Sequence, residues 1–224
     1  MYVAPRDLRA GEATCGLGAT SRQDTTKGSV APHGLRYAGT PMACPRGVAP
    51  GRLRARPRKM PFHVVLVEPE IPPNTGNVAR LCAATGCPLH LVEPLGFRTD
   101  SHAVRRAGLD YWHMVDVRQH SSLQAAESAI ESLRDTESSC QAWFFSGKAS
   151  QSFFDVPVAL GDALVFGRES VGLPEQLLIE RQDFVVGLPT LGQVRSLNLA
   201  NAVAIAIYEG LRRCGALQVD TTRR

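Results

Sequence analysis

Residues suited to holding a nucleotide-like ligand gather in four short segments, each directly after a short apolar run. The segments read EPEIPPNTGN (68–77), SGKAS (146–150), GRESVGLP (167–174) and PTLGQVRSLNLAN (189–201). They are rich in Gly, Pro, Ser and Asn, which let backbone N–H and C=O groups come close to a ligand. The sequence therefore predicts a ligand site at these loops, held by backbone N–H and C=O groups.

Common nucleotide and hydrolase fingerprints are absent from the sequence. No GxGxxG follows the first apolar run, which disfavours a Rossmann dinucleotide or Rossmann methyltransferase site. No GxxxxGK[ST] is present, because SGKAS lacks the upstream glycine at the required spacing. GxSxG is missing too, so a serine hydrolase is disfavoured.

The positive charge is confined to one end of the 224-residue chain. Residues 1–59 hold eleven Lys/Arg and three Asp/Glu, whereas residues 60–224 hold fourteen and eighteen. The first 59 residues also contain eight Gly and six Pro and show no apolar period, so we predict that they are disordered. The predicted organisation is this extension, one domain over 60–217 and a flexible tail over 218–224.

Three interpretations of residues 1–59 remain open. The segment is a translated upstream extension with the real start at Met60, an arm that helps to hold RNA, or an Arg-rich, acid-poor transit peptide. The first is favoured because an orderly fold begins directly after Met60. The arginines and lysine of the second interpretation are Arg52, Arg54, Arg56, Arg58 and Lys59.

Several protein classes are excluded by what the sequence lacks. No apolar run approaches the roughly 18–20 residues of a membrane helix, and no secretory signal pattern is present. The six cysteines form no CxxC pair and no zinc set, and no magnesium set is visible. We therefore expect a cytoplasmic protein with free thiols, no bound metal and no membrane partner.

The apolar patterns of residues 60–224 alternate between strands and helices. Strands are predicted at 62–67, 88–94, 142–146, 163–167 and 183–189, with a possible edge strand at 113–117. Helices are predicted at 74–86 (Asn74 or Thr75 as N-cap, Gly86 just past the end), 101–107, 121–134, 173–180 and 197–213. This alternation predicts an α/β fold, a parallel sheet covered by helices on both faces, with ligands at the carboxyl ends of the strands.

Four stretches in this order carry a family resemblance: 68–86, 105–112, 166–174 and 188–209. Together they resemble the SPOUT superfamily of trefoil-knotted RNA 2′-O-methyltransferases, closest to the small tRNA (cytidine/uridine-34-2′-O)-methyltransferases, over about 60–217. The resemblance implies a parallel sheet with a deep C-terminal trefoil knot, S-adenosyl-L-methionine as cofactor, tRNA as substrate and a homodimer. The implied reaction is methylation of the ribose 2′-hydroxyl at wobble position 34.

The resemblance also implies roles for individual residues. The implied cofactor contacts are Phe145, Ser146, Gly167, Glu169, Leu188, Ser196 and Leu197, and the implied catalytic residues are Arg80, Asn77, Asn198 and Tyr208. RNA would be held by Arg80, Arg105 and Arg106. For Arg80 we favour positioning over proton abstraction, because a guanidinium does not deprotonate readily. Core packing of Phe145 and Leu188, and helix capping by Asn198, remain the structural alternatives.

Three other functions stay open at this point. The first is 2′-O-methylation of ribosomal RNA or of another tRNA position. The second is RNA binding without catalysis, which the presence of Arg80, Glu169, Ser196 and Asn198 disfavours. The third is an unknotted flavodoxin-like nucleotide or flavin binder, which the missing glycine fingerprint disfavours.

Overall fold

The computed structural model describes residues 55–56, 60–97, 112–133 and 140–219. These belong to one compact unit, residues 49–224. Nearly all of the predicted extension 1–59, the predicted helix 101–107 and residues 220–224 lie outside the described residues. Where both flanks of the predicted domain are described, they meet: Ala55 forms an antiparallel bridge with Val219, and the Arg56 N–H donates to the Gln218 carbonyl over 3.1 Å.

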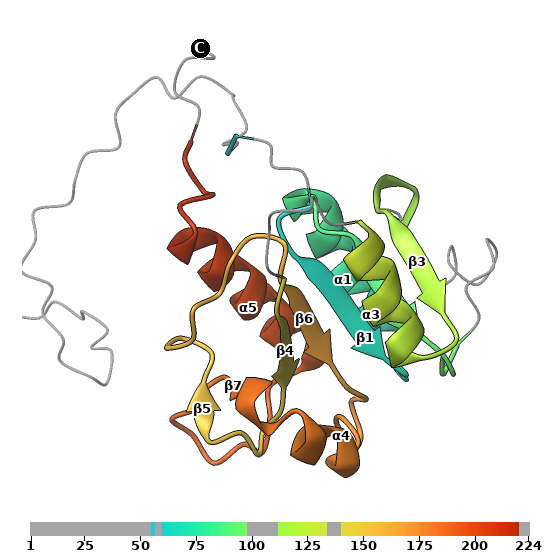
Figure 1. Ribbon diagram of the computed structural model, residues 1–224, viewed down its shortest axis with the longest axis vertical. Coiled ribbons are helices and arrows are strands. Elements are labelled where there is room, and N and C mark those ends of the chain that lie inside the picture. Colours follow the sequence, from blue (N-terminus) through green and yellow to red (C-terminus); the bar gives the residue numbers. More distant parts are fainter. Residues whose placement is uncertain (1–54, 57–59, 98–111, 134–139, 220–224) are drawn as a thin grey trace, which may run out of the picture. The chain divides into compact units, whose positions relative to one another are not determined.

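A parallel sheet organises this unit (Figure 1). Its seven strands lie in the order β3-β2-β1-β6-β4-β7-β5, and every paired neighbour runs parallel. The strands are β1 (His63–Val67), β2 (Leu89–Val92), β3 (Val117–His120), β4 (Ala142–Phe145), β5 (Gln151–Ser152), β6 (Ala163–Phe166) and β7 (Val185–Gly187). The helices are α1 (Pro72–Thr85), α3 (Leu123–Ser132), α4 (Glu175–Glu180) and α5 (Leu199–Arg213), with 3-10 turns at Trp112–Met114 and Gln182–Phe184.

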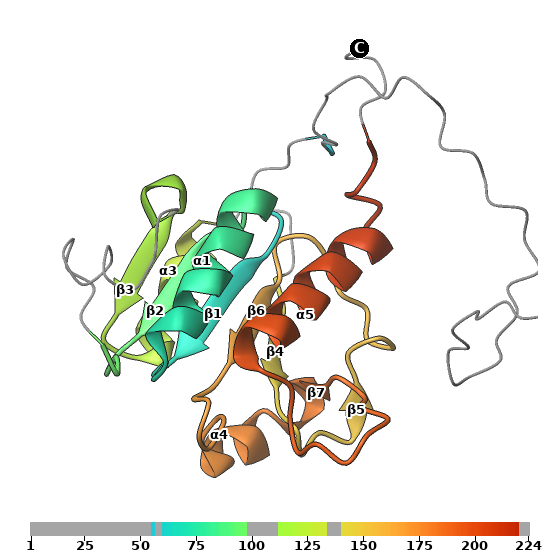
Figure 2. The ribbon, with the colours of Figure 1, turned by 180° about the vertical axis from the view of Figure 1, so that it is seen from behind.

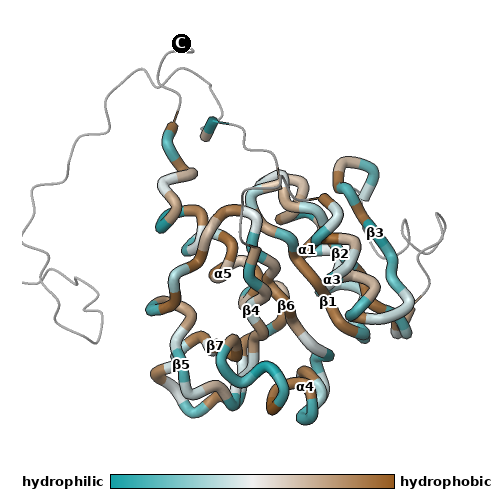
Figure 3. Tube along the Cα trace, in the orientation of Figure 1, coloured by the Kyte–Doolittle hydropathy of each residue, from teal (hydrophilic) through white to brown (hydrophobic). Residues whose placement is uncertain are grey.

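Helices cover both faces of the sheet. Helix α3 lies over one face in Figure 1, and the view from behind shows α1 and α5 side by side over the other (Figure 2). The central strands β1 and β6 are hydrophobic, whereas β3, which ends the sheet, is largely hydrophilic (Figure 3). A parallel sheet with helices on both faces confirms the predicted α/β class.

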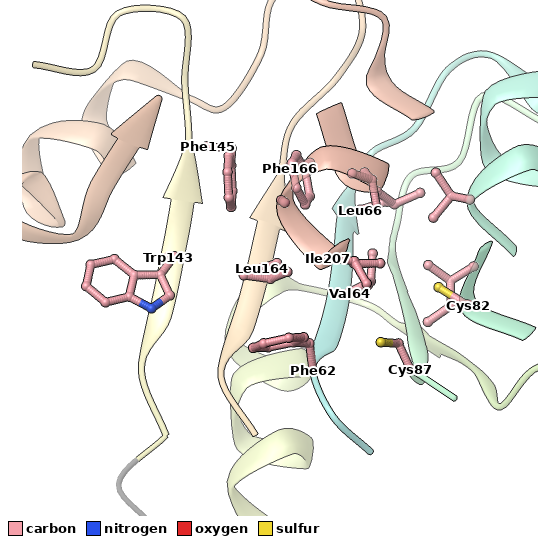
Figure 4. Packing of buried hydrophobic residues seen from close by; sticks show 14 of the residues in the cluster. Phe62, Val64, Leu66, Cys82, Cys87, Trp143, Phe145, Leu164, Phe166 and Ile207 are labelled. Atoms are coloured by element: carbon pink, nitrogen blue, oxygen red, sulfur yellow. The ribbon is translucent and has the colours of Figure 1, made fainter. Parts of the chain in front are cut away.

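The larger core lies between the sheet and the α1–α5 pair (Figure 4). Phe62, Leu164 and Ile207 are fully buried there. A Cβ on Gly210 of α5 would lie 2.8 Å from the Phe62 ring, so this glycine lets α5 pack tightly on the aromatic ring. A smaller core under α3 contains Ala126 and Ile130, two buried residues one turn apart on that helix.

Helix α1 begins earlier than the sequence pattern indicated. It starts at Pro72 after Ile71, which makes no side-chain capping bond, so the predicted N-caps Asn74 and Thr75 lie inside the first turn. Two prolines fit here because the first helical N–H groups have no intrahelical acceptor in any case. Gly86 does end the helix in the left-handed conformation, at φ 76°, as predicted.

Two strands also differ from expectation. The edge strand predicted at 113–117 lies at Val117–His120, because Trp112–Met114 form a 3-10 turn instead. The two-residue strand β5 was not predicted, since a pair of residues carries no readable period. The trefoil knot concerns how the chain threads after β7, and it stays a prediction. Among the described residues, no helix is long and apolar enough to cross a membrane.

Candidate functional site

The four segments singled out in the sequence leave the same edge of the sheet (Figures 1 and 2). They follow β1, β4, β6 and β7, which are successive neighbours in the order β1-β6-β4-β7. Because all four strands are parallel, their carboxyl ends and the loops that follow lie side by side. The predicted position of the ligand site therefore fits the observed topology.

The carboxylate of Glu169 joins the loop after β6 to the start of α1. It accepts hydrogen bonds from the backbone N–H of Glu70 over 2.9 Å and of Ile71 over 3.3 Å. It also accepts one from the Asn74 side-chain amide over 3.0 Å. Three donors hold this carboxylate, so its observed role is to fix the loop that leads into α1. A direct contact between Glu169 and the cofactor stays a prediction.

The side chain of Asn198 makes two kinds of hydrogen bond at the start of α5. Its side-chain oxygen caps the helix by accepting from the backbone N–H of Ala200 over 3.0 Å and of Asn201 over 3.4 Å. Its side-chain nitrogen donates to the Asn74 oxygen over 2.9 Å. The capping alternative is thus correct, and the same side chain also faces the site. Asn74 therefore connects Glu169 to Asn198, and with them the segments that follow β1, β6 and β7.

A second link holds the β1 and β6 loops together. The Glu70 carboxylate accepts from the Ser170 N–H over 3.0 Å and from the Ser170 hydroxyl over 2.9 Å. The hydroxyl bond is the main reason why the pKa of Glu70 is lowered, so this carboxylate is ionised at neutral pH. Arg168 forms an ion pair with Glu68. The loop after β6 is therefore fastened to the loop after β1 at three successive residues.

Glycines let the remaining backbone segments approach one another. A Cβ on Gly167 would lie 2.2 Å from the Gly172 carbonyl carbon, which no real side chain tolerates. A Cβ on Gly147 would lie 3.3 Å from the Arg195 carbonyl oxygen, and one on Gly187 would lie 3.2 Å from that of Ser146. The backbones of the loops after β4, β6 and β7 thus lie at close range, as a cofactor held largely by backbone contacts requires. The residues present fit S-adenosylmethionine.

The side chains predicted to line the cofactor site differ in how far they are buried. Phe145 is 8% exposed and stacks on Phe166 with ring centroids 4.3 Å apart, so its ring belongs to the core (Figure 4). Leu188 is half-buried and packs against the same core. The Ser146 hydroxyl accepts from the Lys148 N–H over 3.1 Å and shapes the loop after β4. Ser196 is exposed and Leu197 is half-buried, directly before α5.

The residues predicted to carry the chemistry do not all converge. Asn77 and Arg80 are both exposed on α1, one turn apart. Tyr208 is 48% exposed on α5 and lies nine positions after Leu199, about 14 Å along the helix axis. Tyr208 therefore does not join Asn198 within one subunit. The predicted RNA contacts Arg105 and Arg106 lie outside the described residues.

Sequence reasoning missed two members of this arrangement. Asn74 was considered only as a helix cap, and Ser170 was not singled out. A buried polar residue in the first turn of a helix is a usable signal, and Asn74 is only 7% exposed. The bond between Ser170 and Glu70 spans 100 residues, and no local pattern reveals such a pair.

Known proteins match the part of the chain that forms the α/β domain. The sequence profile described as the SpoU rRNA Methylase family matches residues 61–208. A tRNA (cytidine(34)-2′-O)-methyltransferase of Acidovorax sp. (strain JS42) is 49% identical over 165 residues, covering 71% of this chain and 96% of that relative. A protein of the same name from Burkholderia cenocepacia (strain HI2424) is 47% identical over 156 residues, covering 69% and 96%.

Solved structures agree with these matches. One, described as giving structural insights into the 2-OH methylation of C/U34 on tRNA, is 45% identical with a TM-score of 0.61 and covers 69% of this chain and 96% of its own. The SpoU methyltransferase AviRb from Streptomyces viridochromogenes, in complex with AdoMet, is 22% identical with a TM-score of 0.61 and covers 74% and 62%. At that identity the likeness is one of fold alone.

Proposed function

Because the chain belongs to the SpoU rRNA methylase family, we propose that it methylates the ribose 2′-hydroxyl of a tRNA at wobble position 34, with S-adenosylmethionine as donor. The observation that carries this proposal is the identity of 45–49% to proteins named for that activity, over 96% of their length. The site supports it, because the four loops predicted to bind the ligand follow neighbouring strands of the sheet, and α1, which carries Arg80, begins after the first of these loops.

The main task of the protein in this reaction is to align the reacting atoms. S-adenosylmethionine, when bound, supplies a methyl group that its sulfonium already activates. The ribose oxygen forms the new C–O bond as the C–S bond breaks, the electron pair of that bond stays on sulfur, and the hydroxyl proton passes to a base. A protein that holds oxygen, methyl carbon and sulfur in line lowers the barrier through orientation alone.

The residues of this chain divide the work of alignment. Glu169 and Asn74 fix the start of α1, and Asn198 fixes the start of α5. Arg80 and Asn77, one turn apart on α1, would then orient the target nucleotide, with Arg80 stabilising charge that develops on the ribose oxygen. The cofactor would be held by the backbone of the loops around Gly147, Gly167 and Gly187, with Ser146, Leu188, Ser196 and Leu197 around it.

The exposed side of α5 supports a homodimer. Ile205 and Tyr208 are 39% and 48% exposed and lie three residues apart, on one side of the helix. Leu191 and Val194, in the loop before α5, are also exposed. We infer that a second copy covers these apolar side chains and that Tyr208 acts at that contact. Substitution of Ile205 and Tyr208 by Asp should yield monomers in light scattering, whereas an unchanged mass would contradict this dimer.

The experiment that tests the activity uses the full-length chain, labelled S-adenosylmethionine and total tRNA from a strain that lacks the gene. Label on the 2′-oxygen of position 34 is the expected result. Label on another tRNA nucleotide would leave the chemistry intact but correct the substrate. Binding of the cofactor should be measured in parallel, because a chain that binds no S-adenosylmethionine cannot be this enzyme. A tRNA substrate would also support a cytoplasmic location.

A second candidate, methylation of ribosomal RNA, is favoured by the description of the matching family. The same incubation with ribosomal RNA separates the two. Label that appears in ribosomal RNA and not in tRNA would replace the first proposal by the second.

A further inference from the structure

Arg168 lies in the turn after β6, where the backbone is held by local contacts. Arg168 and Gly172 form an antiparallel bridge, and the Gly172 N–H donates to the Arg168 carbonyl over 2.9 Å. Gly172 has a φ of 78°, and Gly167 leaves no room for a Cβ against it. The backbone on both sides of Arg168 is therefore fixed, so the arginine side chain starts from a defined position.

The guanidinium of Arg168 pairs with Glu68, a residue with an unusual backbone conformation. Glu68, which directly follows β1, has a φ of 51°, in the left-handed region that non-glycine residues seldom occupy. Its carboxylate makes the ion pair with Arg168. Strained residues of this kind gather at functional sites, where the surrounding structure holds them. The pair spans 100 residues and lies beside Gly167 and Glu169 of the predicted cofactor segment.

The loops after β1 and β6 carry several carboxylates, which would repel an RNA phosphate unless a cation offsets their charge. Glu68, Glu70 and Glu169 bring three carboxylates to the β1 and β6 loops. Glu70 and Glu169 are held by N–H and hydroxyl donors, none of which carries a full charge. Glu68 instead binds the Arg168 guanidinium. Arg168 thus brings a full positive charge directly to one of these carboxylates, at the edge of the sheet where the proposed function places the site.

We propose that Arg168 binds a backbone phosphate of the substrate RNA and that Glu68 is a positioning residue, which holds the guanidinium in place. A guanidinium carries five N–H donors in a planar fork, so one donor can engage a carboxylate while others engage a phosphate. The Arg168 side chain is 43% exposed and that of Glu68 only 21%, so the outer part of the fork is open to a ligand. This inference rests on the proposed function, because it takes RNA as the substrate.

The simpler alternative is an exposed ion pair that only fastens two loops together. Such pairs contribute little to stability, and they are formed equally by carboxylate and guanidinium. That alternative therefore predicts that Arg168→Gln and Glu68→Gln have the same effect. The phosphate role predicts opposite effects on RNA binding, since one change removes the cation and the other removes an anion from the entrance.

The experiment measures binding of a wobble-containing tRNA stem-loop to the full-length chain at a series of salt concentrations. We expect Arg168→Gln to weaken binding several-fold at low salt and to reduce the slope of log K against log salt by about 0.7–0.9, the value for one lost phosphate contact. Glu68→Gln should bind at least as tightly as wild type. Both variants should keep the wild-type affinity for S-adenosylmethionine, which shows that the site still folds.

Arg212→Gln is the matched control, because Arg212 also forms an exposed ion pair, with Glu209, in the last turn of α5. Its slope should equal that of wild type. Equal slopes for wild type and Arg168→Gln, or an equal loss of slope in Arg212→Gln, would overturn the proposal. If the wild-type chain binds ribosomal RNA and not the tRNA stem-loop, the proposed tRNA substrate is wrong, and the same slopes measured on ribosomal RNA decide the role of Arg168.

Discussion

The side-chain amide of Asn198 donates to the side-chain oxygen of Asn74 over 2.9 Å and joins the first turns of two helices that lie 124 residues apart in sequence. The amide nitrogen of Asn74 is in turn bound to Glu169. Asn74 thus uses its acceptor and its donor at once, which fixes the orientation of its amide. One buried amide therefore sets the relative position of α1, α5 and the loop after β6.

Substitution Asn74→Ala should reduce methylation much more than it reduces cofactor binding. Removal of the amide breaks both bonds and leaves Glu169 with only backbone donors, so α1 is no longer held in line with α5. Misplacement of a positioning element by about 1 Å can cost on the order of a hundredfold in rate. The measurement is kcat and KM with tRNA, together with the affinity for S-adenosylmethionine.

Asn201→Ala provides the matched control for Asn74. Asn201 is an exposed asparagine in the first turn of α5, and its backbone N–H, not its side chain, binds Asn198. We expect near wild-type kcat for this variant. A loss of kcat in Asn201→Ala as large as in Asn74→Ala would show that the Asn74–Asn198 bond has no special role.

The sequence pattern predicted the sheet well because each central strand is a short, continuous apolar run. β1, β4 and β6 all lie inside the predicted ranges, since burial on both faces makes their residues apolar, with His63 at the start of β1 as the exception. The start of α1 was misplaced because Asn74 and Thr75 are good N-cap types, whereas the helix begins at Pro72 without any side-chain cap. Local capping preference gave the wrong answer because a distant carboxylate, that of Glu169, holds the segment before the helix by accepting from the backbone N–H groups of Glu70 and Ile71.

The site was predictable in outline but not in its contacts. The topology of a parallel sheet placed the four loops together, and the resemblance named most of the residues in them. The interlocking of Glu70 with Ser170 and of Glu68 with Arg168 was not foreseen, because each pair lies 100 residues apart and leaves no local signal. The ring of Phe145 packs on Phe166 in the core, and its contact with the cofactor stays a prediction.

Substitution Gly167→Ala should abolish binding of S-adenosylmethionine or shift the turn after β6. Its Cβ would meet the Gly172 carbonyl carbon at 2.2 Å, and backbone atoms cannot move aside as a flexible side chain can. Gly192→Ala, in the loop before α5, is the matched control because a Cβ there meets no atom within 4 Å. Calorimetric titration with the cofactor distinguishes the two. Equal affinities for both variants would remove Gly167 from the cofactor site.

Arg80→Lys should retain tRNA binding yet lose most of the rate. A lysine keeps the positive charge but not the planar fork that holds a ribose or phosphate oxygen in a fixed direction. We expect kcat to fall by about 10²-fold, with a small change in KM, because oriented stabilisation of the developing charge is lost. Single-turnover methylation of tRNA measures this. A loss confined to KM would instead make Arg80 an affinity contact.

The stability of the fold should depend on pH through three histidines on neighbouring strands. His63 Nδ1 lies 3.1 Å from His90 Nε2, and His90 Nδ1 lies 2.9 Å from His120 Nε2, so the rings form a hydrogen-bonded row across β1, β2 and β3. Burial lowers the pKa of His63 to about 4 and that of His90 to about 3, and it also lowers the pKa of His120. Nearby Arg118 acts in the same direction, whereas Asp116 opposes it at His63 and His90.

The sign of the dependence follows from these pKa values. Below pH 6.5, the ordinary pKa of a histidine, the histidines become protonated in the unfolded chain but stay neutral in the folded protein. The contribution of these histidines to the free energy of unfolding should therefore be constant above about pH 7. It should fall as the pH drops from 6.5 toward 4, by up to about 1.4 kcal/mol per pH unit for each such histidine. Urea unfolding at pH 7, 6 and 5 measures this loss.

The double substitution His63→Asn and His90→Asn separates this effect from general acid sensitivity. The variant will start from a lower stability, because two buried rings are lost from the sheet. Its stability should nevertheless change less between pH 7 and pH 5 than that of wild type, since asparagine does not titrate. A variant that loses as much stability over this interval as wild type would place the acid sensitivity in groups other than this row of histidines.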